Sequence, residues 1–150
     1  MSKILEGTEV ISALATKIRD GFSTTEIQAV YKDTPTQNIL KPCIFLNMVS
    51  IIQLPKINRK SNRNYTIDII VTGADNNTEL RTWFTKINEQ LLRIVDKIII
   101  SDQVVKMIQG EANIENNELH LIVTYNFDVI KQSDDNEIKM LTRKFKGRVI

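Results

Sequence analysis

Glycine is scarce in this sequence, and its scarcity removes one large group of functions. Only five glycines occur among the 150 residues, and none belongs to a glycine-rich loop that would hold phosphate groups at a helix N-terminus. The serine motif of α/β-hydrolases and the paired-histidine motif of zinc proteases are missing as well. The sequence therefore gives no support to a nucleotide-dependent enzyme or to a common class of hydrolase.

Cysteine and histidine are nearly absent. One cysteine, Cys43, excludes an internal disulfide, and with His120 as the one histidine a zinc site would lack its usual nitrogen and sulfur ligands. Cys43 lies in an apolar run and is expected to be a buried, unreactive thiol. No catalytic constellation accompanies His120, which we interpret as a solvated or interface residue. We predict no catalytic residue, no metal, no cofactor and no enzymatic activity.

Long hydrophobic runs and a strong charge imbalance are also missing. No stretch approaches the roughly 20 apolar residues of a membrane span, and the first residues lack the apolar core of a signal peptide. The net charge of +2 is too small to indicate nucleic-acid binding from bulk electrostatics. We therefore expect a cytoplasmic protein of one compact domain with no membrane partner and no specific nucleic-acid partner.

The first amphipathic helix is predicted over residues 8–20. Thr8 is a candidate N-cap, and Gly21 is a natural C-terminal stop. Spacings of three and four residues place its apolar side chains on one face and leave Lys17 and Arg19 in solvent. That apolar face consists of Val10, Ile11, Leu14 and Ile18.

A second, stronger helix is predicted over residues 76–95, with Asn77 or Thr78 as its cap. Its apolar stripe suits packing on a sheet. Trp83 and Phe84 are expected to serve as packing anchors, because aromatic side chains most often supply core area. The stripe consists of Leu80, Trp83, Phe84, Ile87, Leu91, Ile94 and Val95.

The strands are predicted from alternation and from β-branched residues. A short strand covers residues 27–31, and residues 43–54 form a strand that we expect to be buried on much of both faces. With the alternating strand at residues 65–72 it forms an antiparallel hairpin whose long basic tip covers residues 55–64. After the second helix, residues 97–100, 104–114 and 119–130 form a three-stranded meander with a turn at residues 115–118.

The order of these elements predicts the α+β class: a mainly antiparallel sheet packed by two amphipathic helices, with a long β-hairpin and a basic C-terminal tail. We divide the chain into a domain at residues 1–131 and a basic extension at residues 132–150. Two short strands, residues 27–31 and 97–100, are candidate sheet edges with which a neighbouring copy could pair.

Basic residues cluster in two places that contain no acid, the hairpin tip and the C-terminal end. Both are candidate docking elements for acidic neighbours, and the alternative for each is a solvated charged surface. The end segment has too few apolar residues for a core of its own, so we expect it to order on a partner. The candidate interface residues are Lys56, Arg59, Lys60, Arg63, Lys139, Arg143, Lys144, Lys146 and Arg148.

Three segments in order give the chain a family resemblance: IQAVY at residues 27–31, QNILKPCIFL at residues 37–46 and LHLIVTYNFDV at residues 119–129. Together with the opening helix, they make residues 8–132 similar to tail terminator, or tail completion, proteins of phages and of phage-tail-like bacteriocins from low-GC Gram-positive bacteria. The shared features are core and turn patterns rather than catalytic signatures.

The resemblance implies a ring, typically hexameric, on the last ring of tail-tube protein, meeting the sheath in a contractile tail. It also implies contact with head–tail connector proteins, assembly in the host cytoplasm, and a final place at the neck or collar of the particle. One alternative is another neck component, such as a head–tail joining protein. A second is a small nucleic-acid-binding module, although few aromatic residues accompany the basic ones to stack on bases.

Overall fold

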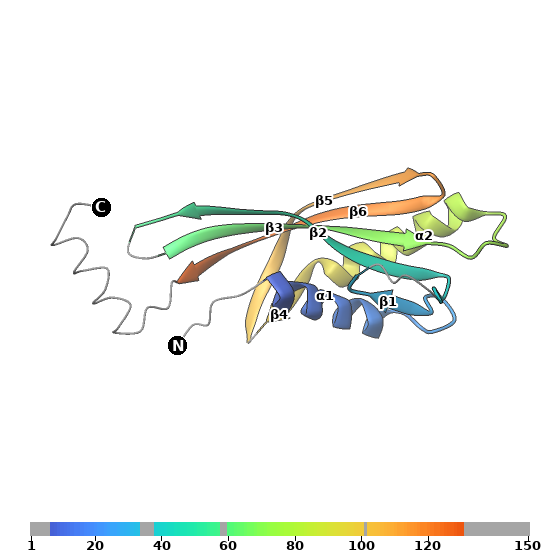
Figure 1. Cartoon of the computed structure of the whole chain (residues 1–150), viewed down its shortest axis with the longest axis horizontal. Coiled ribbons are helices and arrows are strands. Elements are labelled where there is room, and N and C mark those ends of the chain that lie inside the picture. Colours follow the sequence, from blue (N-terminus) through green and yellow to red (C-terminus); the bar gives the residue numbers. More distant parts are fainter. Residues whose placement is uncertain (1–6, 34–37, 58–59, 101, 131–150) are drawn as a thin grey trace.

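The computed structural model describes residues 7–33, 38–57, 60–100 and 102–130. Two helices and a six-stranded mixed sheet agree with the predicted α+β class (Figure 1). Among the described residues no helix is long and apolar enough to cross a membrane. In chain order the elements are α1 (Gly7–Gly21), β1 (Ala29–Tyr31), β2 (Cys43–Pro55), β3 (Lys60–Thr72), α2 (Leu80–Val95), β4 (Lys97–Ile100), β5 (Gln103–Glu115) and β6 (Glu118–Ile130).

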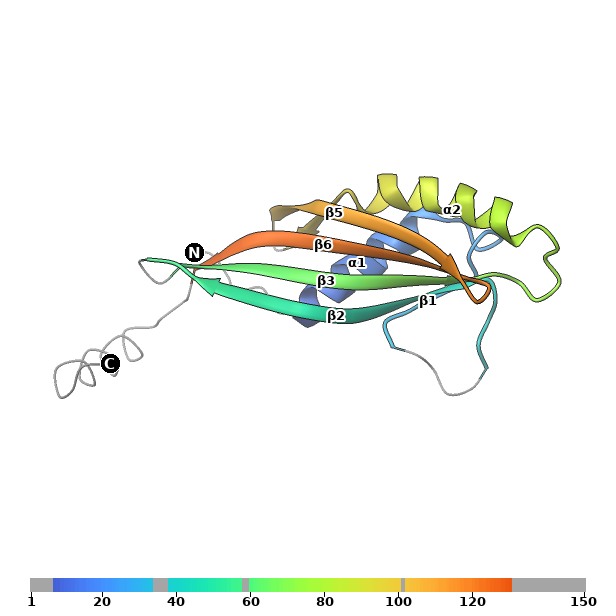
Figure 2. The ribbon, with the colours of Figure 1, turned by 90° about the horizontal axis from the view of Figure 1, so that it is seen from above.

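The strand order across the sheet is β1-β2-β3-β6-β5-β4. The short β1 pairs in parallel with β2, and the other four pairings are antiparallel. The hairpin of β2 and β3 and the meander of β4, β5 and β6 both occur as predicted. β6 lies beside β3, so the two units form one continuous sheet (Figure 2).

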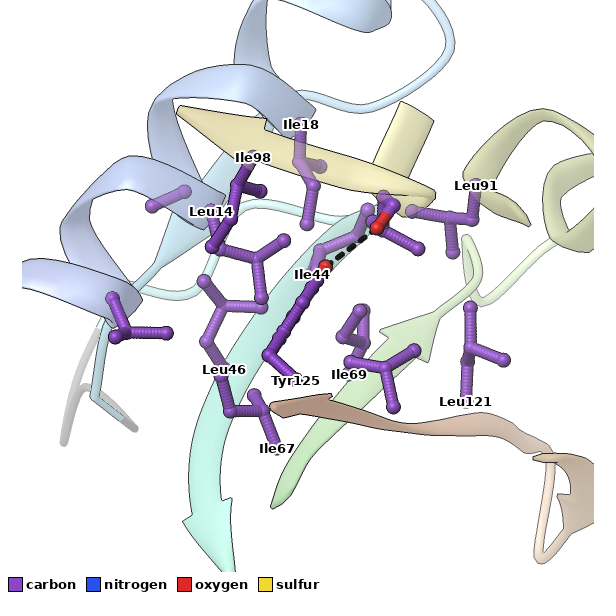
Figure 3. Packing of buried hydrophobic residues seen from close by; sticks show 14 of the residues in the cluster. Leu14, Ile18, Ile44, Leu46, Ile67, Ile69, Leu91, Ile98, Leu121 and Tyr125 are labelled. Carbon is purple, nitrogen blue, oxygen red and sulfur yellow. Dashed lines mark hydrogen bonds between the residues drawn. The ribbon is translucent and has the colours of Figure 1, made fainter. Parts of the chain in front are cut away.

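Both helices pack on one face of this sheet, and none of the described residues forms a helix on the opposite face (Figures 1 and 2). The sheet curls so that its marginal strands, β1 and β4, both contact α1. The alternating residues of β3 and β6 that were predicted to share an apolar face are buried here, with Tyr125 at the centre (Figure 3). The Tyr125 hydroxyl donates a hydrogen bond of 2.7 Å to the carbonyl of Val95, which satisfies its one polar atom.

Helix α1 covers the predicted residues 8–20, but it already includes Gly7, so Thr8 lies inside the helix and is not its N-cap. It ends at Gly21, and its buried stripe contains Val10, Leu14 and Ile18. Arg19 is exposed, but Lys17 is only partly so, because its Nζ donates a hydrogen bond to the carbonyl of Lys97 in β4. The ammonium group of Lys17 thus links the helix to β4.

Helix α2 begins four residues later than predicted, at Leu80 rather than residue 76. The side chain of Asn77 accepts a hydrogen bond of 2.8 Å from the backbone N–H of Glu79, which makes it part of the turn before the helix rather than its cap. Phe84 is fully buried, whereas Trp83 is partly buried, and the centroids of the two rings are 5.5 Å apart. Phe84 is therefore the main aromatic anchor.

The hairpin tip is shorter than predicted. Strand β2 ends at Pro55 and β3 already begins at Lys60, so residues 61–64, which were expected in the loop, pair with β2 and β6. The run from Ser61 to Asn64 lacks β-branched and aromatic side chains, which is why its strand was not predicted. Neighbouring strands on both sides override that weak local propensity.

The basic extension at residues 132–150 lies outside the described residues, and the division of the chain at residue 131 stays a prediction.

Candidate interaction surface

Both margins of the sheet are open along much of their length. The structure places β1 and β4 at the two ends of the strand order, as their short predicted strands suggested. β1 covers only residues 43–45 of β2, and β4 covers only residues 103–106 of β5. Among the described residues, residues 47–55 of β2 and 108–115 of β5 therefore pair with a strand on one side only. Backbone groups on the other side are available to another chain.

The open stretch of β2 is also unusually apolar. Its first four residues, 43–46, are buried, but none of the residues from 47 to 55 is. The expectation of a strand buried on both faces is thus wrong for its second half, which extends beyond the helices (Figure 1). Four of its apolar residues are between 50% and 57% exposed, and the register with β3 puts Ile51 on the helix-covered face and Ile52 and Leu54 on the opposite face. The four residues are Val49, Ile51, Ile52 and Leu54.

A groove of about 540 Å³ runs along this edge, between the start of α1 and the first half of the β2 margin. Leu46, Met48 and Ile51 line it from β2, Ile11 lines it from α1, and it continues past Lys32. A bulge at Val49, between Met48 and Ser50, shifts the pairing with β3 at this point. The groove thus offers apolar side chains directly beside unpaired backbone groups.

The described basic residues of the predicted interface lie in contacts within the chain. Lys56 Nζ is 3.0 Å from the Asp128 carboxylate. Arg63 donates hydrogen bonds to the side chains of Gln53, at 2.5 Å, and Tyr65, at 3.2 Å. Both residues therefore already have partners within the chain, and the structure does not bring them together as a free basic patch.

The remaining predicted interface residues lie outside the described part of the chain. They are Arg59, the side chain of Lys60, and Lys139, Arg143, Lys144, Lys146 and Arg148.

The helix-free face of β3 and β6 carries a hydrogen-bonded polar ladder. Asn126 donates to Asn62 at 2.7 Å and to Asn64 at 2.5 Å, and the hydroxyls of Thr66 and Thr124 are 3.1 Å apart. Polar residues at even-numbered positions of both strands were the sequence pattern from which this ladder could have been predicted. Taken together, they predict a solvated sheet face on which side chains of neighbouring strands form hydrogen bonds with one another.

His120 continues this ladder. Its Nδ1 lies 3.0 Å from Asp68, and its Nε2 lies 3.4 Å from Glu118. Partial burial disfavours the charged imidazole, but the hydrogen bond and charge of Asp68, with Glu118, outweigh it and raise the pKa of His120. Both neighbours are acids on this sheet face, so the arrangement is a surface ion pair.

Two further groups in the described part of the chain, Cys43 and Tyr125, have raised pKa values because they are buried. Burial raises the pKa of the Cys43 thiol, which keeps it protonated and unreactive. Burial also raises the pKa of the Tyr125 hydroxyl, to which the charge of Asp96 adds. In the described part of the chain, no three His, Cys, Asp or Glu side chains are grouped in a way that could hold a metal ion.

Three comparisons place the chain among known proteins. A family model described as phage tail terminator protein matches residues 9–137. No curated protein sequence matches. A chain from the solved "virion of native gene transfer agent (GTA) particle" is similar in fold, with a TM-score of 0.53 and 13% sequence identity, over 80% of this chain and 93% of that chain. A second solved chain is 9% identical over 87% of this chain and 99% of that one, and its TM-score of 0.41 is too low to show a shared fold.

Proposed function

Because the chain belongs to the phage tail terminator family, a family of structural virion proteins, we propose that it forms a ring that caps the end of a tail tube. Its place in the family makes it a structural component of a phage-type tail, associated with other tail proteins. Beyond this, we propose that it forms a ring, that the ring has sixfold symmetry and that it lies at the tube end. We also propose a sheath contact in a contractile tail and a collar position facing the head–tail connector.

The observation that carries this proposal is the sheet that is open at both margins. A closed ring of identical subunits needs two different surfaces per subunit that fit each other. Residues 47–55 on one margin and 108–115 on the other are two such surfaces, far apart on the strand order. A protein that acts as a monomer has little reason to leave both margins unprotected.

Terminating a polymer adds a further requirement. One face of the ring matches the last tube ring, and the other face fails to recruit another one. The far end of the β2–β3 hairpin extends beyond the helices (Figure 1) and contains Lys56 and Arg63 with their contacts. It is a candidate for the tube or sheath contact. The basic extension at residues 132–150 is proposed as a second docking arm.

The position and copy number of the protein in purified particles test the proposal. A small affinity tag on the full chain, imaged with a gold-labelled binder, is expected at one end of each tail, with mass spectrometry giving about one ring of copies per tail. Label along the whole tube would identify a tube subunit instead. Label on the portal side of tail-less heads would identify a joining protein.

A further inference from the structure

We infer that neighbouring copies join by antiparallel pairing between residues 47–55 of β2 in one copy and residues 108–115 of β5 in the next. The inference rests on the proposed ring and names the two surfaces that build it. It makes the sheet of each copy continuous with that of its neighbours.

Strand direction is the first support. Between the two open margins lie β2, β3, β6 and β5, and each of these pairs is antiparallel. With four alternating strands, the two open margins run in opposite directions. Copies that all point the same way along a common axis therefore meet in an antiparallel pair, which is the arrangement that a ring requires.

Side-chain size is the second support. The β2 margin presents the bulky Ile51 beside its groove. The β5 margin has the exposed Gly110 and Ala112, which pair with the buried Val123 and Leu121 and so lie on the helix-covered face. The small side chain of Ala112 leaves room for Ile51 of the β2 margin, whereas the space beside Gly110 is taken by Met107 and Leu92 of the same copy.

The ends of the two runs also match in character. With Ile51 opposite Ala112, both on the helix-covered face, antiparallel pairing places Ile108, 59% exposed, beside Leu54 and Pro55 at one end. It places Glu115 beside Met48 at the other end, where Lys32 and Asp33 both lie in the wall of the groove. Residues 108–115 contain two acids and no base, whereas the β2 run is uncharged, so no like charges oppose one another along the pair.

The strands already attached to the margins leave this pairing free. β1 lies on residues 43–45 and β4 on residues 103–106, outside both open runs. The two open runs occupy different positions along the strand direction. The strand pairing connects Ile51 to Tyr65, Tyr65 to Tyr125 and Tyr125 to Met107, so Ile51 lies level with Met107 and not with the middle of the β5 run. Pairing therefore staggers one copy against the next, as strands must be staggered in any closed sheet.

Cysteine cross-linking of the full chain tests the pairing. In particles carrying Ile51→Cys together with Ala112→Cys, a short bismaleimide is expected to give a covalent ladder above the dimer. Native Cys43 is buried and stays unmodified. The matched control combines Ile51→Cys with Lys86→Cys on the exposed face of α2, and it is expected to stay monomeric.

A double variant that stays monomeric in particles with normal occupancy and tail length would overturn the pairing and leave the capping function standing. Dimers from Ile51→Cys alone would show β2 pairing with a second β2, which also overturns it. A ladder in particles whose tail length does not depend on the protein would support the pairing and remove the capping function.

A second variant covers the case of failed incorporation. Ile51→Lys, if its circular dichroism matches the wild type, is expected to reduce self-association in solution at least tenfold, because a lysine on an edge strand blocks pairing. Lys86→Glu is expected to leave it unchanged. Equal loss in both variants, or in neither, would contradict the inferred interface.

Discussion

At the scale of residues, burial separates the side chains that support the fold from those left for contacts. The described core contains no buried charged residue, and its most deeply placed hydroxyl, that of Tyr125, bonds to Val95. Sequence alternation correctly placed Tyr65, Ile67 and Leu121 on the buried face. The partners of Lys56 and Arg63 lie in other strands, so no local pattern could have shown that these two bases are engaged.

Phe84 and Trp83 are neighbours with different burial, which gives a direct test of the core. Phe84→Ala is expected to lower the free energy of unfolding by about 3–5 kcal/mol, because it empties a fully enclosed position. Trp83→Ala is expected to cost clearly less, since part of that ring stays in solvent. Urea denaturation of both variants measures the difference; an equal loss would mean that α2 is rotated from its described orientation.

The pair of His120 and Asp68 predicts a pH dependence of stability. The raised pKa means that the folded state binds the proton more tightly than the unfolded state. The stabilisation is full below the ordinary histidine pKa and is lost as pH rises through the raised value. Its size is expected to be under about 1 kcal/mol, because the pair is partly exposed.

The measurement is the unfolding free energy of wild type and His120→Gln between about pH 5.5 and 9, where histidine is the side chain that titrates. The wild-type advantage should shrink towards the alkaline end. Asp68→Asn serves as a control that should weaken the same dependence, with Glu118 left as the remaining acidic partner. An advantage that grows with pH would contradict the ion pair.

At the scale of elements, local periodicity was sufficient wherever an element buries one face. Both helical stripes and the buried face of β6 followed from it. It failed for β2, because residues 47–55 are still largely apolar although none of them is buried, whereas all of residues 43–46 are. Whether a helix covers a strand depends on tertiary placement, which β-propensity does not contain.

The turn between β5 and β6 gives a test of local backbone chemistry. Asn116 and Asn117 both have positive φ, of 48° and 62°, as a two-residue hairpin turn of type I′ requires. Asn117→Gly is expected to keep or slightly raise the melting temperature. Asn117→Val is expected to destabilise by about 1–2 kcal/mol, because a β-branched residue is strained in this conformation. Thermal melts compare the two, and equal stability would contradict the turn type.

At the scale of the whole molecule, helices cover one face of the curled sheet, and among the described residues long stretches of β2 and β5 have a neighbouring strand on one side only (Figure 2). The sequence could suggest short edge strands, but the open stretches of β2 and β5 became visible only once the strand order was known. Their exposure follows from the shortness of β1 and β4, which protect three and four residues of their neighbours.

The basic extension is expected to act in docking and not in folding. Deleting residues 132–150 should leave the melting temperature of the domain nearly unchanged and reduce the amount of protein bound to tails. Quantitative mass spectrometry of purified particles measures the second effect. Normal occupancy of the truncated protein would remove the docking role, and loss of folding would show that the domain boundary at residue 131 is wrong.

The length distribution of tails made without this protein tests the central claim most directly. Electron micrographs of particles from cells that lack it are expected to show overlong or ragged tubes, and expression of the full chain in the same cells should restore a single length. Tails of normal, uniform length that have failed to join heads would contradict termination and identify a joining protein instead.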